Sequence, residues 1–173
     1  RETMQAALAY AQTGHLCLAT LHANNAYHAM NRIINFFAIE NRPLLFLDLS
    51  VSLKAIISQR LIKKPDGMRS PAVEILLNTR HIQELIERGE INSIKEAMEQ
   101  SMAPGSQTFE QDLFRLYREN VITLDEALAN ADSPTNLSWL INNSQFGASS
   151  GQDNPKQMSN IDFDTSDENG TSF

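Results

Sequence analysis

The sequence predicts an α/β protein in which a sheet with covering helices is followed by a small all-helical subdomain. Three observations lead to this expectation. A short apolar run at 16–21 lies between two helical patterns, which is typical of a strand buried in a parallel sheet. A turn at 65–67 joins two stretches that can pair as an antiparallel edge. Amphipathic helical patterns then follow one another over 79–142.

The first part of the chain reads as a helix, a strand and a second helix. Residues 2–12 repeat apolar side chains at helical spacing, and Gly14 follows where a left-handed C-terminal cap is expected. Residues 16–21 show no polar alternation, so we expect a fully buried strand there. Asn24 or Asn25 can cap the next helix, which is expected to pack on this strand.

The middle of the chain is expected to form a long helix and then the antiparallel edge of the sheet. Apolar residues recur at helical spacing over 43–61, and Pro43 stands suitably near the start of this predicted helix. The turn Pro65-Asp66-Gly67 follows, and residues 72–77 are apolar and β-branched enough for a strand. We expect that strand to pair back on residues 60–62.

Beyond residue 78 the pattern changes to short amphipathic helices around a small core. Thr108 and Thr123 each begin a capping box, in which the side chain three positions later reaches back to the cap. Gly89 is expected to close the first of these helices. The predicted helices are 79–88, 92–100, 108–119, 123–130 and 134–141.

Composition divides the chain into three parts. We predict a sheet-containing core over 1–78, a helical subdomain over 79–142 and a disordered acidic tail over 143–173. The tail is rich in Ser, Gly, Asn, Gln and Asp, and its few aliphatic side chains cannot offset the entropy of ordering it. It carries much of the net charge of −7, so the ordered part is only mildly acidic.

The bulk properties exclude several classes of protein. No basic stripe is present to neutralise phosphates, so no nucleic acid partner is expected. No apolar run approaches the ~20 residues that cross a bilayer, and no signal-peptide pattern opens the chain; we therefore expect a cytoplasmic protein without direct membrane insertion. Cys17 is the single cysteine and is expected in the core, and Trp139 is expected to close the last helix onto the core.

Three histidines, His15, His22 and His28, are the first candidates for chemistry. Alternate residues of a strand share a face, so His15 and His22 would lie on opposite faces and no metal is expected. A metal-dependent hydrolase that uses all three histidines is a third and least favoured hypothesis. Two readings stay open for the predicted strand. His22, with Thr20, ends it and can hydrogen-bond a phosphate oxygen, or His22 caps the next helix and His15 lies at the surface.

Arg32 lies off the apolar face of its helix. It is either a solvated or salt-bridged surface arginine, or a contact to a phosphate or another subunit. The sequence contains no phosphate loop of the G-x-x-x-x-G-K-[ST] type, so the strand cannot be a nucleotide site by itself. We therefore interpret the chain as a piece of a larger nucleotide-handling protein.

Several stretches of the sequence resemble one family. Thr13-Gly14-His15 and Thr20-Leu21-His22-Ala23-Asn24-Asn25-Ala26 resemble its histidine box. The chain is similar in this respect to the PilT/PilU family of type IV pilus retraction ATPases, within the secretion ATPase superfamily, and to the PilU branch most closely. The resemblance covers roughly residues 1–140. Further matching stretches are Arg1-Glu2-Thr3, Arg32-Ile33-Ile34, 52–61, 107–111 and 130–133.

The resemblance implies the C-terminal part of a RecA-like P-loop ATPase domain, from a hexameric motor that couples hydrolysis of ATP, with Mg²⁺, to pilus disassembly and twitching motility. In that family the phosphate loop and the Walker B glutamate precede the counterpart of Arg1. Phosphoryl transfer depends on those elements, so this stretch alone is expected to be inactive and to bind neither ATP nor Mg²⁺ tightly.

The resemblance also implies partners. They are a homo-hexamer or co-assembly with a second retraction ATPase, and a pilus platform protein of the inner membrane. The implied location is the bacterial cytoplasm, peripheral to that membrane. The alternative hypothesis is a noncatalytic interaction module that docks on retraction-motor subunits.

The resemblance finally assigns site residues. The histidine box implies nucleotide sensing by His15 and His22, with Thr20 and Arg32 as contacts to a phosphate or a neighbouring subunit. A later segment stands where retraction ATPases carry a helix needed for retraction. Its residues are His81, Ile82, Leu85, Ile86 and Arg88.

Overall fold

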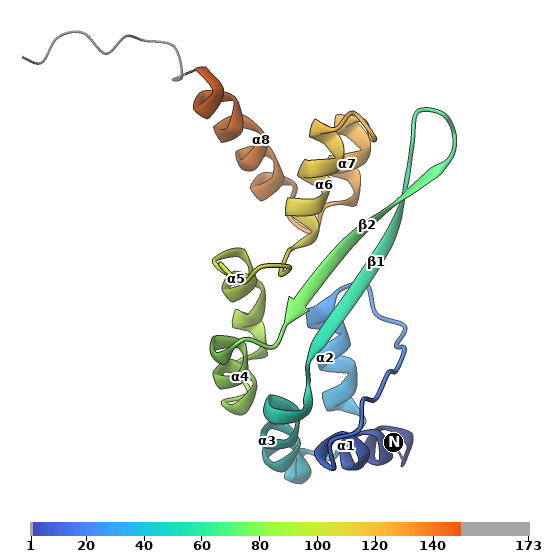
Figure 1. Cartoon of the computed structure of the whole chain (residues 1–173), viewed down its shortest axis with the longest axis vertical. Coiled ribbons are helices and arrows are strands. Elements are labelled where there is room, and N and C mark those ends of the chain that lie inside the picture. Colours follow the sequence, from blue (N-terminus) through green and yellow to red (C-terminus); the bar gives the residue numbers. More distant parts are fainter. Residues whose placement is uncertain (1, 150–173) are drawn as a thin grey trace, which may run out of the picture.

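The structure is a computed structural model that describes residues 2–149, and for residues 144–149 only the helical backbone. The fold is mixed α/β: a long two-stranded ribbon runs through the molecule, helices pack along it, and its turn projects beyond them (Figure 1). In chain order the elements are α1 (Glu2–Gln12), α2 (Ala26–Asn35), η1 (Ile39–Asn41), α3 (Arg42–Ser52), β1 (Ala55–Lys63), β2 (Arg69–Leu77), α4 (Arg80–Glu87), η2 (Ile91–Ser93), α5 (Ile94–Glu99), α6 (Phe109–Arg118), α7 (Leu124–Asn130) and α8 (Pro134–Ser149).

The antiparallel pair confirms the predicted hairpin and extends it. β1 and β2 pair from Ala55↔Leu77 to Lys63↔Arg69, which includes the predicted partners of 60–62. The turn between them is closed by the Lys64 amide, which donates to the carbonyl of Met68 at 2.8 Å. Gly67 takes a φ of +82° there, in the left-handed region that suits glycine.

The predicted parallel strand over 16–21 is wrong. The segment has no regular secondary structure, and Leu16 and Leu18 are 81% and 89% exposed. A strand needs a hydrogen-bonding neighbour, and the only sheet within the described residues is the β1–β2 ribbon. Cys17 is exposed as well, so its predicted place in the core is also wrong. Helix α2 therefore packs mainly on the β1–β2 ribbon and on η2, and of this segment only Leu21 reaches the apolar cluster that contains α2.

The predicted helix over 43–61 is half right. Helix α3 ends at Ser52, and Leu53 already has extended dihedral angles. The carbonyls of Ser50 and Leu53 both accept hydrogen bonds from the Asn78 side chain, at 2.8 and 2.7 Å. The remaining residues form β1 because pairing with β2 satisfies their backbone groups and alternate side chains can then be buried.

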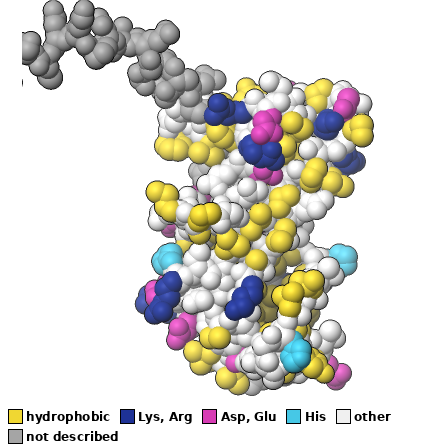
Figure 2. Space-filling model, viewed as in Figure 1, with side chains coloured by type: hydrophobic (Ala, Val, Ile, Leu, Met, Phe, Trp, Pro, Cys, Tyr) yellow, Lys and Arg dark blue, Asp and Glu magenta, His cyan; other side chains and the backbone are white. Residues whose placement is uncertain are grey.

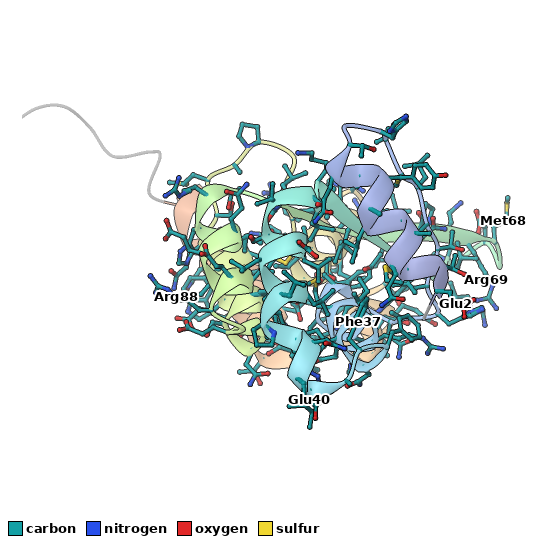
Figure 3. The ribbon with its side chains drawn as sticks, turned by 90° about the horizontal axis from the view of Figure 1, so that it is seen from below. Glu2, Phe37, Glu40, Met68, Arg69 and Arg88 are labelled. Carbon is teal, nitrogen blue, oxygen red and sulfur yellow. The ribbon has the colours of Figure 1, made fainter. Side chains whose placement is uncertain are left out.

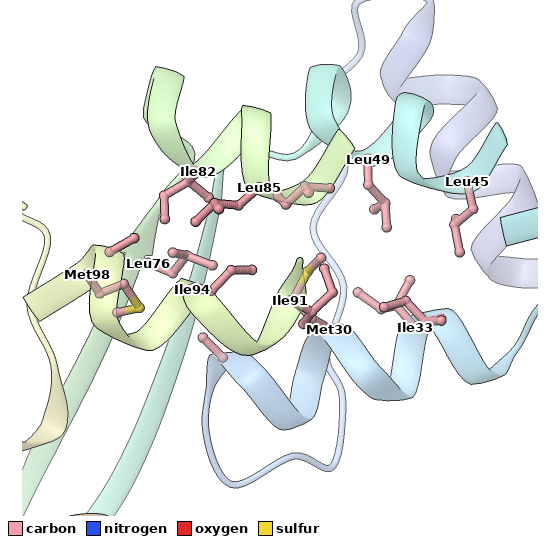
Figure 4. Close-up of a cluster of buried hydrophobic side chains, with 14 of the residues drawn as sticks. Met30, Ile33, Leu45, Leu49, Leu76, Ile82, Leu85, Ile91, Ile94 and Met98 are labelled. Carbon is pink, nitrogen blue, oxygen red and sulfur yellow. The ribbon is translucent and has the colours of Figure 1, made fainter. Parts of the chain in front are cut away.

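Two clusters of buried apolar side chains lie along the ribbon. The first joins helices α2 to α5 and the end of β2 (Figure 4). The second packs α6, α7 and the start of α8 against Ile62 and Ala72 of the ribbon. Helices α4 and α5 thus share their core with the preceding helices, and the predicted domain boundary at residues 78 and 79 stays a prediction. The first cluster includes Met30, Ile33, Leu45, Leu49, Leu76, Ile82, Leu85, Ile91, Ile94 and Met98.

The helices beyond residue 78 follow the predicted pattern, with η2 and α5 sharing the span predicted as one helix. Thr108 forms a complete capping box with Gln111, and the Thr123 hydroxyl accepts from the amide of Glu126. Gly89 closes α4 with a φ of +72°. No helix within residues 2–149 is both long enough and apolar enough to span a membrane.

The end of the chain departs from expectation in two ways. Helix α8 continues to Ser149, so the first residues of the predicted disordered tail are helical. The rest of that predicted tail lies outside the described residues. Trp139 is 63% exposed, so the prediction that it closes α8 onto the core is wrong. Leu137 and Ile141 take that place instead.

Candidate functional site

The histidine-box segment is an exposed loop that leads from α1 to α2. At its start the Thr13 hydroxyl donates to the carbonyl of Tyr10 at 2.7 Å and lies 2.9 Å from Nδ1 of His15. The Tyr10 and His15 rings meet edge to face, with centroids 5.9 Å apart. These contacts hold His15 at the C-terminal end of α1, although its side chain remains open to solvent.

The other end of the loop is held by Arg32. Its guanidinium donates to the backbone carbonyl of His22, ten positions earlier and before the start of α2, at 3.1 Å. The side chains of Thr20 and His22 are themselves exposed, and histidine side chains are visible at the molecular surface in Figure 2. Arg32 is therefore an exposed arginine that positions the loop backbone; a contact to phosphate or to another subunit stays a prediction.

Asn25 provides the N-cap of α2. Its Oδ1 accepts from the amide of His28 at 2.9 Å, so the reading in which His22 caps this helix is wrong. Its Nδ2 donates to Oδ2 of Asp132 at 2.8 Å, a residue 107 positions later in the chain. The end of the histidine-box loop is thus tied directly to the segment between α7 and α8.

Arg60 of β1 completes this connection. Its guanidinium donates to the carbonyls of Asn130 at 2.7 Å and Asn24 at 3.2 Å, and pairs with Oδ1 of Asp132. We call Asn24, Asn25, Arg60, Asn130 and Asp132 the Arg60 clamp. The guanidinium carbon also lies 3.9 Å from the centroid of the Phe109 ring, so the clamp rests on the second apolar cluster.

The electrostatics of the clamp favour an ionised Asp132. Burial alone would raise the pKa of this carboxyl, but the hydrogen bonds from Asn25 and Arg60 outweigh it and hold the pKa below its usual range. Glu74 of β2 lies nearby and accepts from the amide of Ala26 at 2.7 Å. Here burial dominates and raises the pKa of Glu74. Two acidic side chains therefore support the first turn of α2. The environment lowers the pKa of Asp132 and raises the pKa of Glu74.

A cavity of about 260 Å³ opens beside the clamp. Its polar lining consists of amides, one imidazole and one ion pair, contributed by Asn24, Asn25, His28, Arg60, Asn130 and Asp132. The side chains of Asn25, Arg60 and Asp132 already bond to one another or to backbone carbonyls within the clamp. The arrangement can therefore position the histidine-box loop, and it offers no nucleophile paired with a base.

The three histidines of the least favoured, metal-dependent hypothesis are not brought together. Within the part of the chain that the structure describes, no group of three His, Cys, Asp or Glu side chains is arranged to hold a metal ion. His15 is engaged with Thr13 at one end of the loop, whereas His28 lies on α2 beside the cavity.

The predicted retraction-helix residues divide into two kinds. Ile82 and Leu85 (Figure 4), together with Ile86, are buried in the first apolar cluster and hold α4 in place. His81 and Arg88 are exposed, and Arg88 lies at the periphery of the molecule (Figure 3). Only the second kind is available to a partner, as are Arg80 and Glu84, which form an ion pair at 2.9 Å on the same helix.

Sequence reasoning missed the clamp. The sequence places Arg60 in both a predicted helix (43–61) and the stretch 60–62 expected to pair with 72–77, and it gives residues 130–133 a part in a predicted helix end and in the family resemblance, but no contact with Arg60. The available signal was a charged residue within the largely apolar stretch 55–62, since such a side chain needs a partner when it is half-buried. Nothing local to Arg60 indicates that the partner is Asp132.

Comparison with known proteins identifies relatives over most of the chain. A family described as "Type II/IV secretion system protein" matches residues 1–128. The type IV pilus ATPase PilU of Pseudomonas aeruginosa is 49% identical over 142 residues, which are 82% of this chain and 37% of that protein. The retraction ATPase PilT of the same organism is 35% identical over 136 residues, 79% of this chain and 40% of that protein.

Solved structures of the same kind match the fold. A crystal structure of the pilus retraction motor PilT with bound ADP has a TM-score of 0.71 at 35% identity, and covers 80% of this chain and 38% of that one. The ATPase DotB of Legionella pneumophila has a TM-score of 0.64 at 25% identity, over 75% of this chain and 36% of that one. The chain spans less than half the length of each of these relatives.

Proposed function

Because this chain belongs to the type II/IV secretion system protein family, we propose that it is the C-terminal portion of a hexameric pilus retraction ATPase. In the whole motor, hydrolysis of ATP drives pilus disassembly and twitching motility. The 49% identity to PilU over most of the chain is the observation that supports this proposal. A cytoplasmic motor docked on a platform protein of the inner membrane, alone or with a second retraction ATPase, is part of the same proposal.

The histidine-box loop is proposed to sense the nucleotide. Its exposed Thr20 and His22 side chains offer a hydroxyl and an imidazole to a phosphate or to a neighbouring subunit. Hydrogen bonds from Arg32 and within the Arg60 clamp hold the end of the loop. A displacement of the loop would therefore be transmitted to α2 and to the segment between α7 and α8. Family motors use ATP with Mg²⁺. The ATP would supply the phosphoryl group, and the Mg²⁺ would neutralise the charge of the phosphates.

The residues present fit only part of a nucleotide site. His22, Thr20 and Arg32 can donate to an anion, but the sequence has no glycine-rich phosphate loop to enclose one. We therefore propose that these 173 residues alone neither bind ATP tightly nor hydrolyse it. ATP turnover by the purified chain above that of a His22→Ala variant would contradict this statement.

A chimera tests the proposed function itself. The matching segment of P. aeruginosa PilU is replaced by this chain, and twitching motility is measured in a strain that lacks PilU. We expect motility to return with this chain and to be lost with His22→Ala in the same chimera. A chimera that assembles and hydrolyses ATP but gives no motility would overturn the proposal.

One feature favours a second candidate, a noncatalytic module that docks on motor subunits. On β1 the side chains of Ile57 and Leu61 are 70% and 53% exposed and form an apolar strip on the surface of the protein. A module of this kind would co-elute with assembled PilU as a separate chain bound to it. DNA upstream of the Arg1 codon separates the two candidates: an in-frame phosphate loop and Walker B glutamate support the motor, and a stop codon supports the module.

A further inference from the structure

A second cavity, of about 240 Å³, lies between α6 and the start of α8. Its lining residues include the acidic Glu99 and Glu110 and the aromatic Trp139. None of the described residues that line it is a lysine or an arginine. Cavities for drug-sized ligands measure roughly 300–1,000 Å³, so this one suits a single side chain better than a nucleotide.

Glu110 contributes a buried carboxylate oxygen that lacks a donor. Its Oε1 accepts from Nζ of Lys95 at 3.1 Å and from the amide of Ser133 at 2.7 Å. Its Oε2 is also buried, yet no described residue donates a hydrogen bond to it. Buried polar atoms are nearly always paired in folded proteins. The unpaired oxygen therefore marks a position where an additional donor would be stabilised.

The two other groups at the cavity also suit a cation. Glu99 is exposed, and its Oε1 accepts from Nδ2 of Asn136 at 3.1 Å, which fixes the carboxylate at the rim. Trp139 has no place in either apolar cluster and exposes most of its ring. Indole is the aromatic ring that attracts cations most strongly. Lys95 balances one of the two carboxylates, so one negative charge remains.

We propose that this cavity binds the cationic group of a basic side chain, lysine or arginine, from a protein partner. The ammonium or guanidinium donates to Glu110 and Glu99 while its alkyl stem or planar face lies on Trp139. This acidic–aromatic site is separate from the Arg60 clamp and does not depend on the proposed motor function. Phosphates and nucleotides are excluded by the sign of the charge.

Trp139 allows a direct test, because it is the single tryptophan among the 173 residues. The whole chain is titrated with N-acetyl-arginine amide, and tryptophan fluorescence is recorded. The control ligand is N-acetyl-citrulline amide, which has nearly the same shape and no charge. We expect a saturable change with the arginine compound, with a Kd in the millimolar range for so small a ligand, and none with the citrulline compound.

Matched variants then locate the site. Glu99→Gln removes an exposed charge at the rim and is expected to weaken binding about two- to fivefold. Glu40→Gln removes the same charge from η1, which contributes no residue to the lining of the cavity, and should leave binding unchanged. Glu110→Gln is tested as well, with circular dichroism to verify folding. An equal response to both ligands, no saturable response, or equal affinity in the Glu99 and Glu40 variants overturns the proposal.

Discussion

Replacing Arg60 by methionine should destabilise the protein by about 2 to 3 kcal/mol. The substitution removes three hydrogen bonds and leaves the Asp132 carboxylate with Asn25 as its donor within the clamp. A hydrogen bond to a charged group is worth about 1.5–3 kcal/mol, whereas an exposed ion pair is worth less than about 1 kcal/mol. Both side chains are about one-fifth exposed, which places this pair between those limits, at about 1–1.5 kcal/mol. The two hydrogen bonds to the Asn24 and Asn130 carbonyls bring the total to about 2 to 3 kcal/mol.

Urea denaturation followed by circular dichroism measures the effect, and Arg69→Met is the matched control. Arg69 lies on the exposed end of the hairpin (Figure 3), with one long hydrogen bond to the carbonyl of Leu61 at 3.4 Å. We expect its loss to cost less than about 0.5 kcal/mol. Amide exchange at His28, whose N–H is bonded to Asn25, should accelerate in the Arg60 variant. Equal stability of the two variants, or unchanged exchange at His28, would refute the role given to the clamp.

The same clamp predicts a pH dependence of definite sign. The pKa of Asp132 in the folded state is lowered from 3.8, so its contribution to the free energy of unfolding is fully present above pH 3.8. That contribution is lost as the pH falls through the folded-state pKa. In Asp132→Asn this part of the acid sensitivity should disappear, and a variant that keeps the full acid sensitivity of the parent would show that another group is responsible.

Two further predictions separate structural from functional residues. Ile86→Ala should lower the free energy of unfolding by about 2–5 kcal/mol because Ile86 is fully buried, whereas the exposed Arg88→Ala should change it by less than about 0.5 kcal/mol. Similar losses in both variants would contradict the assignment of the two faces of α4. Glu74→Gln should gain stability relative to the parent as the pH rises above 4.5, because burial raises the pKa of Glu74 and its ionised form disfavours the folded state. Denaturation from pH 4.5 to mildly alkaline pH measures this, and a relative stability that is flat or falls with pH counts against it.

Local patterns were enough for much of the C-terminal half. The helices beyond residue 78 begin and end near their predicted positions because their caps are local: Thr79, Thr108 and Thr123 each accept from an amide three residues later. The hairpin was also predictable, since the Pro65-Asp66-Gly67 turn sets its register. These interactions span only a few residues, so one sequence suffices to find them.

The two wrong elements share one cause. Residues 16–21 have the composition of a buried strand, and residues 55–61 continue a helical apolar spacing. Whether such a segment becomes a strand depends on a partner strand at the right place. β1 has one in β2, and residues 16–21 have none within the described residues. Periodicity in a single segment does not carry this information.

The candidate site shows the same division. The sequence alone determined that His15, Thr20 and His22 share one short segment and that an asparagine caps the helix after it. Only the tertiary structure decided that this cap is bonded to Asp132 and that Arg60 joins the two, because those contacts bridge 107 and 72 positions of the chain. Short-range hydrogen bonds join residues that are close in the sequence, so the sequence alone predicts them. The clamp forms only once the hairpin and the two apolar clusters have brought distant segments together.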